Sequence, residues 1–193
     1  AEIYCGEVFP FQGFPPMTPE RVPDVVFHTR VRNEALGGDN PFEWKDVTSA
    51  ELFDGRRVVV FGVPGAFTPA CSEHHLPGFE RHYDDLRRLG VDAVLCVSVN
   101  DAFVMHQWAR SRSIEKVSML PDGNGDFTRR MGLLVERKAQ GMGMRSWRYS
   151  MLVEDGTVMK IFVEPGVRDN PQGVGLTVSN AETMLAWLKG RAG

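Results

Sequence analysis

Residues 62–77 read Gly-Val-Pro-Gly-Ala-Phe-Thr-Pro-Ala-Cys-Ser-Glu-His-His-Leu-Pro, and they directly follow the apolar, β-branched run 58–61. That run predicts a buried strand, because such side chains suit a strand covered on both faces. Pro64 and Gly65 then predict a turn that ends the strand. The residues after the turn predict the start of a helix, so the stretch indicates one strand-turn-helix unit of an α/β domain.

Cys71 is the most reactive side chain that this stretch could present. Thr68 is a suitable N-cap for the predicted helix and Pro69 suits its first position, which places Cys71 on the first turn. Free backbone amides and the positive end of the helix dipole favour a thiolate over a thiol there. The alternative is a buried structural cysteine, but such a residue needs neither the cap nor the fixed backbone. We therefore expect Cys71 to be a reactive thiol.

Strands and helices alternate along the rest of the chain, which predicts an α/β fold with mostly parallel pairing at its centre. Strands are expected over 24–31 (an edge strand), 43–47 (pairing near it), 58–61, 91–99, 117–120, 147–154 and 157–163. Helices are expected over 49–53, 69–88, 102–110 and 180–190. Pro77 should kink the helix over 69–88, because its ring removes an intrahelical hydrogen bond. Asp155 and Gly156 predict a tight hairpin, and Ser179 with Glu182 predicts a capping box for the last helix.

The composition indicates one domain and argues against several kinds of partner. The chain has 193 residues, 42% of them apolar, enough for one buried core over residues 18–193. Residues 1–17 predict an irregular N-terminal extension or a remnant of cloning. The 22 basic and 25 acidic residues are dispersed, so nucleic acid and acidic membranes are poor candidate partners. No segment predicts a membrane span or a signal peptide, so we expect a cytoplasmic protein.

The three cysteines, Cys5, Cys71 and Cys96, form no Cys-x-x-Cys pair. A disulfide scaffold or a structural zinc site is therefore not expected. Cys96 lies in an apolar run that predicts a central strand, where a cysteine is usually buried. Nothing around Cys5 would activate its thiol. The acidic segment 122–126 lacks the ligand spacing of a calcium loop and predicts a turn.

Four blocks together resemble the type II (peroxiredoxin-five-like) peroxiredoxins. They are residues 62–77, 97–105 (VSVNDAFVM), 121–128 (PDGNGDFT) and 145–152 (RSWRYSML), in the order of that family. The likeness is closest to the bacterial, cyanobacterial and plant type II branch and to the peroxiredoxin domain of peroxiredoxin-glutaredoxin hybrids. It implies a thioredoxin-like fold, with a central mixed sheet flanked by helices. It also implies a thiol peroxidase that uses no metal, haem or flavin.

The resemblance also implies roles for individual residues. Cys71 matches the peroxidatic cysteine, which reduces hydrogen peroxide and alkyl hydroperoxides and becomes a sulfenic acid. Thr68 matches the threonine that contacts the thiolate and the peroxide, Pro64 the proline that shields the site, and Arg148 the arginine that stabilises the anion. Ala70 stands where many members have threonine or glycine, and no catalytic role is attached to that position.

Residue chemistry supports the role of Arg148 independently. Peroxide cleavage by a thiolate needs a hydrogen-bond donor and a positive charge for the developing oxyanion. A period of two over 147–153 places Arg148 with Ser150 and Leu152, away from the larger apolar set. The alternative is a solvated surface arginine. The aromatic residues Phe103, Trp108 and Trp147 are expected in the core or at a dimer contact.

The remaining expectations concern support and recycling of Cys71. His75 matches a family histidine that supports the site, although a cysteine-histidine dyad with His74 or His75 is conceivable from spacing alone. Cys96 matches a resolving cysteine of some plant members. The family implies glutathione with glutaredoxin, or thioredoxin, as reductant, and a homodimer. A redox sensor or binding protein with negligible turnover is the alternative function.

Overall fold

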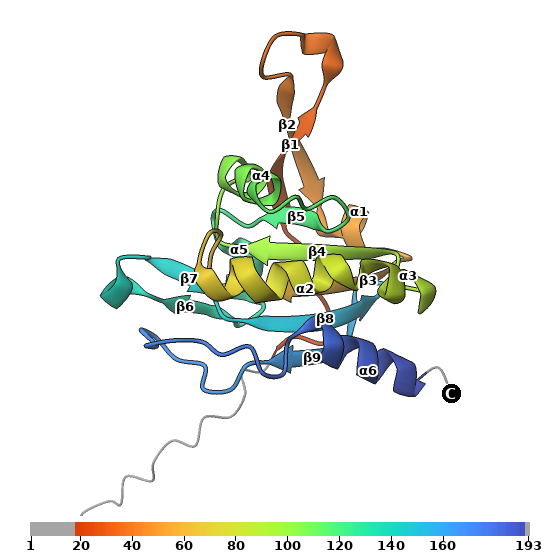
Figure 1. The fold of residues 1–193 in the computed structure, drawn as a ribbon, viewed down its shortest axis with the longest axis vertical. Helices are drawn as coiled ribbons and strands as arrows, with labels where there is room; N and C mark the ends of the chain where they lie inside the picture. The colour runs from red at the N-terminus through yellow and green to blue at the C-terminus, as the bar shows by residue number, and fades with distance from the viewer. Residues whose placement is uncertain (1–17, 192–193) are drawn as a thin grey trace, which may run out of the picture.

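Five strands form the central sheet, in the order β5-β4-β3-β8-β9. The computed structural model describes residues 18–191, so the predicted extension over 1–17, with Cys5, lies outside the described residues. The strands are β5 (Ser118–Pro121), β4 (Ala93–Ser98), β3 (Arg57–Gly62), β8 (Tyr149–Glu154) and β9 (Thr157–Val163) (Figure 1). Strand β3 pairs in parallel with β4, and β4 with β5, whereas β8 runs antiparallel to both β3 and β9. The mixed sheet implied by the family resemblance is confirmed. The mostly parallel pairing expected from the order of elements is wrong, because two of the four strand pairings are antiparallel.

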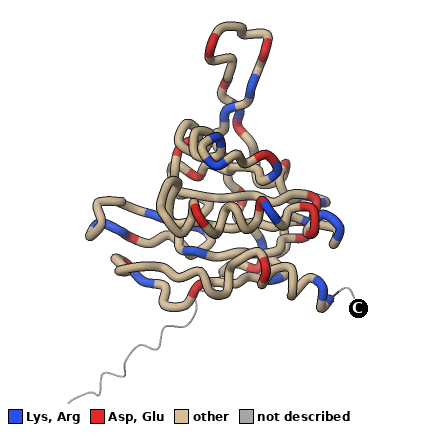
Figure 2. Tube along the Cα trace, in the orientation of Figure 1, with Lys and Arg blue, Asp and Glu red and all other residues tan. Residues whose placement is uncertain are grey.

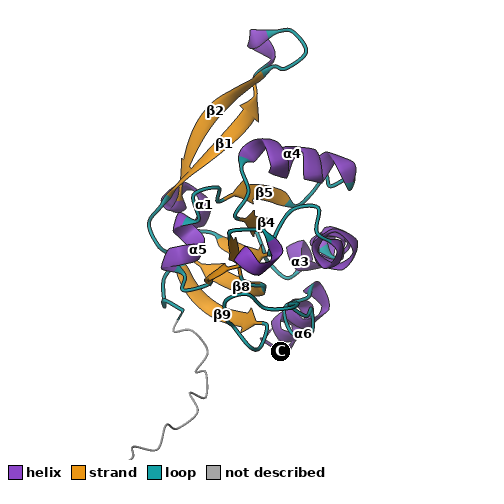
Figure 3. Ribbon diagram, turned by 90° about the vertical axis from the view of Figure 1, so that its left-hand side faces the viewer, coloured by secondary structure: helices purple, strands orange, loops and turns teal. Residues whose placement is uncertain are grey.

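Helices cover both faces of this sheet, as its edge-on view shows (Figure 3). The helices on one face are α2 (Leu76–Arg81), α3 (Tyr83–Arg88), α4 (Ala102–Ser111) and α6 (Ala181–Arg191). The short helices α1 (Ser49–Phe53) and α5 (Asp126–Arg130) lie on the other. Positively and negatively charged residues are interspersed along the chain (Figure 2). None of the helices formed within residues 18–191 has the length and apolar character to cross a bilayer.

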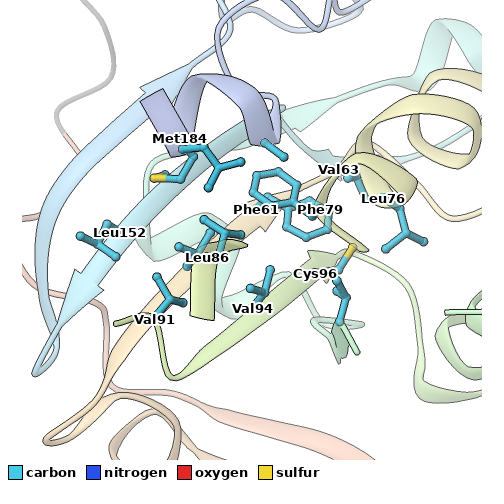
Figure 4. Packing of buried hydrophobic residues seen from close by; sticks show 14 of the residues in the cluster. Phe61, Val63, Leu76, Phe79, Leu86, Val91, Val94, Cys96, Leu152 and Met184 are labelled. Atoms are coloured by element: carbon cyan, nitrogen blue, oxygen red, sulfur yellow. The ribbon is translucent and has the colours of Figure 1, made fainter. Parts of the chain in front are cut away.

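The two faces of the sheet follow from the alternation of side chains along each strand. In β3, Val59 and Phe61 join the cluster under α2, and Val58 and Val60 join the cluster on the opposite face. Phe61 stacks on Phe79 of α2 with ring centroids 4.2 Å apart (Figure 4). Burying each such aromatic ring stabilises the fold by about 1.5–3 kcal/mol, which fixes α2 against the sheet.

The strands expected over 24–31 and 43–47 are present and the expected pairing between them is confirmed, but this pair lies outside the central sheet. Strand β1 (Val26–Arg32) pairs along its whole length with β2 (Phe42–Thr48) in a separate antiparallel hairpin that projects from the body (Figure 1). Only Phe27 of β1 is buried, because the rest of the strand is largely polar and has no second apolar face for a sheet to cover. Another small pair, β6 (Leu134–Glu136) and β7 (Met144–Ser146), was not predicted.

The long helix expected over 69–88 is broken twice. A π-helical turn spans Cys71–His75, where the amide of Leu76 bonds the carbonyl of Cys71 five residues back. Pro77 follows, and since proline has no amide hydrogen, the wider turn takes the place of the predicted kink. The second break, at His82 between α2 and α3, was not predicted.

The predicted capping box of the last helix is also wrong. Asn180 accepts the amide of Thr183 at 2.8 Å and so caps α6 in place of Ser179. Ser179 is fully buried, and its side chain bonds Glu164 instead. The element nevertheless starts within two residues of the expected position.

Candidate active site

The loop between β3 and the π turn carries the predicted site. Pro64 and Gly65 are buried, and the Thr68 hydroxyl donates to the Gly65 carbonyl at 2.8 Å. The predicted side-chain cap by Thr68 is therefore not made, although its main-chain carbonyl accepts the amide of Ser72, as an N-cap carbonyl does. The hydroxyl oxygen keeps its lone pairs open, and the O–H can rotate toward a bound molecule.

Cys71 is fully buried at the start of the π turn, in the cluster under α2. Its neighbour Ser72 accepts a hydrogen bond from the indole nitrogen of Trp108 at 2.9 Å, which fixes the turn against α4. Trp108 is thereby confirmed as a core residue. π-helical turns occur frequently at functional sites, because they aim side chains differently from a regular helix.

Arg148 lies immediately before β8 and is only 3% exposed, so the surface alternative is wrong. Its Nη1 donates to Nδ1 of His75 at 3.1 Å, on the same turn as Cys71. The period-two prediction is confirmed, since Leu152 lies in the Cys71 cluster and Tyr149 lies across the sheet. The Nε atom of Arg148 has no hydrogen-bond partner among the described residues, so the guanidinium retains donor capacity.

His75 is held as a neutral ring with a defined tautomer. Its Nε2 lies 2.9 Å from the carbonyl of Ser179 and must donate to it, which leaves Nδ1 as the acceptor for Arg148. Burial, and then the charge of Arg148, lower the pKa of His75 to about 3. His75 therefore does not take up a proton at neutral pH, so it is not the general base of a cysteine-histidine dyad. His74 is exposed, so it does not share this environment.

Cys96 lies beneath the site, on β4 opposite Phe61 of β3. It is a free, fully buried thiol in the same apolar cluster as Cys71 (Figure 4). Burial, and the neighbouring Cys71, raise the pKa of Cys96 well above its ordinary value, with Arg148 opposing. The burial expected from its strand sequence is confirmed.

Asn100, which follows β4, also holds the loop before Cys71 in place. The side-chain oxygen of Asn100 accepts the amide of Ala66 at 3.0 Å and the hydroxyl of Ser98 at 2.7 Å. Phe67 follows with a left-handed backbone (φ 63°) and is half exposed. A bulky residue in that region stores strain, which persists only where neighbouring contacts hold the loop.

The acidic segment 122–126 forms the turn before α5, as predicted. The Asp122 carboxylate accepts the amides of Phe127 and Thr128 and the Thr128 hydroxyl at 2.6–3.2 Å. Burial raises the pKa of Asp122, and these hydrogen bonds partly oppose the shift. Within the part of the chain that the structure describes, no three His, Cys, Asp or Glu residues gather in a way that could hold a metal ion.

The structure thus brings Arg148 against His75, on the π turn that begins at Cys71, and these two residues come from segments far apart in the sequence. Thr68 and Pro64 lie in the loop that precedes this turn. Sequence reasoning missed Ser179, whose carbonyl binds Nε2 of His75, and Glu164, which binds Ser179. It also missed Asn100, which fixes the loop. An acidic residue next to a proline at a strand end, as in Glu164 and Pro165, gives no signal of such a role.

Comparisons with known proteins agree with this arrangement. Residues 22–185 match the Redoxin family. A peroxiredoxin of Synechocystis sp. is 56% identical over 174 residues, covering 90% of this chain and 92% of that protein. A hybrid peroxiredoxin of Haemophilus influenzae is 48% identical over 172 residues, covering 89% of this chain and 66% of that protein. The solved structure of reduced Prx3 with hydrogen peroxide from Vibrio vulnificus superposes with a TM-score of 0.76 at 39% identity, covering 91% and 97% of the two chains.

A thioredoxin-like sheet that carries a buried thiol and a buried arginine on neighbouring segments defines a thiol-dependent oxidoreductase. The chain belongs to the peroxiredoxin family, the thiol-dependent peroxidases, as the identity over nine tenths of its length shows. The expected fold and enzyme class are confirmed.

Proposed function

We propose that this protein reduces hydrogen peroxide and alkyl hydroperoxides through a sulfenic acid on Cys71. The Cys71 thiolate attacks one peroxide oxygen, so an S–O bond forms as the O–O bond breaks. The sulfur is oxidised to the sulfenic acid, and the leaving oxygen takes a proton and departs as water or an alcohol. The observation that carries the proposal is the buried guanidinium of Arg148, held by neutral His75 on the turn of Cys71.

The other residues fit supporting roles in this step. Arg148 retains donor capacity for the thiolate and for the developing oxyanion, since its bond to His75 uses only Nη1. The Thr68 hydroxyl can turn from the Gly65 carbonyl toward the peroxide. Pro64, buried in the same loop, would exclude water from the reacting atoms. The relative from Vibrio vulnificus was solved with hydrogen peroxide, which supports the same substrate here.

The test of this proposal compares two serine variants. Cys71→Ser should lose peroxide consumption in the presence of a thiol reductant, because serine is nearly isosteric but far less acidic. Cys96→Ser is the matched control in the same cluster and should turn over. Consumption by Cys71→Ser at the wild-type rate would refute the proposal. A stoichiometric burst without turnover in the wild-type protein would identify a redox sensor.

We further propose that an external thiol reduces the sulfenic acid. The thiol condenses with it to a mixed disulfide and releases water, and a second thiol then frees Cys71. Cys96 is a poor internal partner, because it is fully buried in a central strand and burial keeps its thiol protonated. Extracting a central strand residue costs more than opening a helix start. The hybrid relative supports glutathione with glutaredoxin as the donor system, and thioredoxin is the alternative.

Peptide mapping tests the recycling route. The reduced protein receives one equivalent of peroxide, free thiols are blocked, and the peptides are identified by mass. A Cys71 sulfenic acid, or its adduct with added glutathione, is expected. A dominant crosslink between Cys71 and Cys96, together with lost turnover in Cys96→Ser, would refute the external route and favour thioredoxin.

The remaining parts of the proposal are a homodimer and a cytoplasmic location. Trp44 and Phe103 are 59% and 49% exposed and contact edge to face at 5.5 Å, which supports an interface near the Asn100 loop. The cycle needs a reducing compartment to supply thiols, which supports the cytoplasm. Sedimentation at several protein concentrations would test the dimer.

A further inference from the structure

Glu164 is a buried carboxylate directly after β9, and the peroxidase chemistry described above does not use it. It is 1% exposed, yet five hydrogen bonds satisfy it. Its Oε1 accepts the amides of Thr177, Val178 and Ser179 and the Ser179 hydroxyl at 2.8–2.9 Å. Its Oε2 accepts the Thr177 hydroxyl at 2.6 Å. One carboxylate therefore holds three consecutive residues of the segment before α6.

That segment contacts the candidate active site through the main-chain carbonyl of Ser179. The carbonyl of Ser179 accepts Nε2 of His75 at 2.9 Å, and this bond decides which ring nitrogen carries the proton. The other nitrogen, Nδ1, is then left to accept Nη1 of Arg148 at 3.1 Å. If the Ser179 carbonyl moved, the His75 proton could shift to Nδ1, and the acceptor for Arg148 would be lost.

Glu164 also reaches Arg148 through the main chain. Its amide donates to the Arg148 carbonyl at 3.1 Å, and its carbonyl accepts the indole nitrogen of Trp147 at 2.7 Å. Two routes thus converge on Arg148, one through Ser179 and His75 to the guanidinium, the other through the backbone beside it. The Glu164 carboxylate and both ring nitrogens of His75 are hydrogen-bonded along these routes, and only Nε of the Arg148 guanidinium is left without a partner among the described residues.

We propose that Glu164 is a positioning residue for the peroxide step, which fixes the tautomer of His75 and thereby the orientation of Arg148. This inference rests on the proposed peroxidase function. The carboxylate touches neither Cys71 nor the peroxide; it acts through Ser179 and His75. Burial alone would raise the pKa of Glu164, and the hydrogen bonds from Thr177, Val178 and Ser179 outweigh it and lower that pKa, so the carboxylate is ionised at neutral pH.

The test uses Glu164→Ala, with Glu164→Gln as the conservative variant and Asn180→Ala as the matched control. Glutamine keeps an oxygen for the three amides. Asn180→Ala removes the cap of α6 next to Ser179 and should lower the melting temperature. It leaves the hydrogen bonds of Ser179 with Glu164 and with His75 in place. Three quantities are measured for each: the melting temperature, the second-order rate constant with hydrogen peroxide, and the ¹⁵N chemical shifts of the His75 ring.

Glu164→Ala should lower the rate constant about ten-fold, since small displacements of a positioned group cost factors of this order or more. Its His75 shifts should move toward a mixture of tautomers. Glu164→Gln should stay within about three-fold of wild type and keep the tautomer. Asn180→Ala should lose stability with both other readouts unchanged. If Glu164→Ala does not fold, Glu164→Asp is used, and a smaller change in the same direction is expected.

Two results would overturn the inference. One is a Glu164→Ala (or Glu164→Asp) protein with the wild-type rate and tautomer. The other is an Asn180→Ala protein that loses as much rate as Glu164→Ala, because the effect would then follow from stability alone. Absence of turnover in the wild-type protein would refute the proposed function instead, and the ¹⁵N shifts would still decide whether Glu164 sets the tautomer.

Discussion

Acidification should destabilise this protein through His75 in a way that can be isolated. The folded-state pKa of His75 is about 3, whereas an exposed histidine has a pKa of about 6.5. Between these values the unfolded chain binds a proton that the native protein excludes. The contribution of His75 to stability is therefore fully present above about pH 6.5 and is lost progressively as the pH falls toward 3.

The size of the effect follows from the same two pKa values. Each pH unit within the window costs about 1.4 kcal/mol for one proton, and lowering the pH from 7 to 5 costs about 2 kcal/mol. Solvent does not screen the effect, because His75 is 1% exposed. A loss of this size is a substantial part of the 5–15 kcal/mol typical of a folded domain.

The assay is urea unfolding at pH 7, 6 and 5, at one protein concentration, for the parent and for His75→Gln. Both proteins carry Cys71→Ser, so that no reactive thiol ionises. Glutamine can accept from Arg148 and donate to the Ser179 carbonyl, but it does not titrate. The free energy of unfolding of the parent should fall by about 2 kcal/mol more than that of the variant. Equal pH dependence of the two proteins would refute the account of His75 as a buried neutral ring.

Three further predictions concern Arg148, Gly62 and Asn100. Arg148→Ala should slow the peroxide step about 100-fold in stopped-flow traces, with partial recovery in Arg148→Lys, because lysine lacks the planar fork of donors; an unchanged rate would remove Arg148 from the reaction. Gly62→Ala should lower the urea-unfolding free energy by about 2 kcal/mol, because its Cβ would meet Cε1 of buried Tyr149 at 2.1 Å; a neutral effect would mean that the ring can move aside. Asn100→Ala leaves the Ala66 amide unpaired and should cost about 1 kcal/mol and slow the reaction, whereas stability loss with an unchanged rate would limit Asn100 to a structural role.

The parts of the fold that could be predicted are those that depend on the pattern of apolar and polar residues within one short segment. The β-branched run before Pro64 predicts β3, and the period of two after Trp147 separates the two faces of β8. The pairing of β1 with β2 is also predictable from the sequence, but the separation of this pair from the central sheet is not. That separation depends on which surfaces the folded core leaves uncovered.

The residues of the candidate site also differ in whether the local sequence predicts them. Within the stretch from Pro64 to His75, turn and helix signals predict the end of the strand and the position of Cys71, whereas the site roles of Pro64, Thr68 and His75 follow only from the family resemblance. The alternation of side chains over 147–153 predicts the correct face for Arg148. It does not predict the burial of Arg148, since an isolated arginine is usually exposed. Glu164 and Ser179 were missed because their roles depend on contacts between residues that are distant in the sequence. Glu164 and Ser179 are 15 residues apart, and Ser179 and His75 are 104 residues apart. Single-sequence pattern carries no information on such pairs.

The neutrality of His75 and the charge of Arg148 depend on each other, and this links the acid sensitivity of the fold to the chemistry. A buried guanidinium next to an imidazolium would place two cations 3.1 Å apart at low exposure, which is strongly unfavourable. Burial and the charge of Arg148 keep His75 neutral, although the hydrogen bond to the Ser179 carbonyl opposes this pKa shift, so Arg148 is the cation of this pair. A buried charge without a full set of partners is costly unless the site binds an opposite charge. The thiolate of Cys71 and the oxyanion of the cleaved peroxide are the anions that the proposed reaction brings there. The buried Arg148 cation beside neutral His75 therefore lowers the stability of the fold and would also favour the reaction.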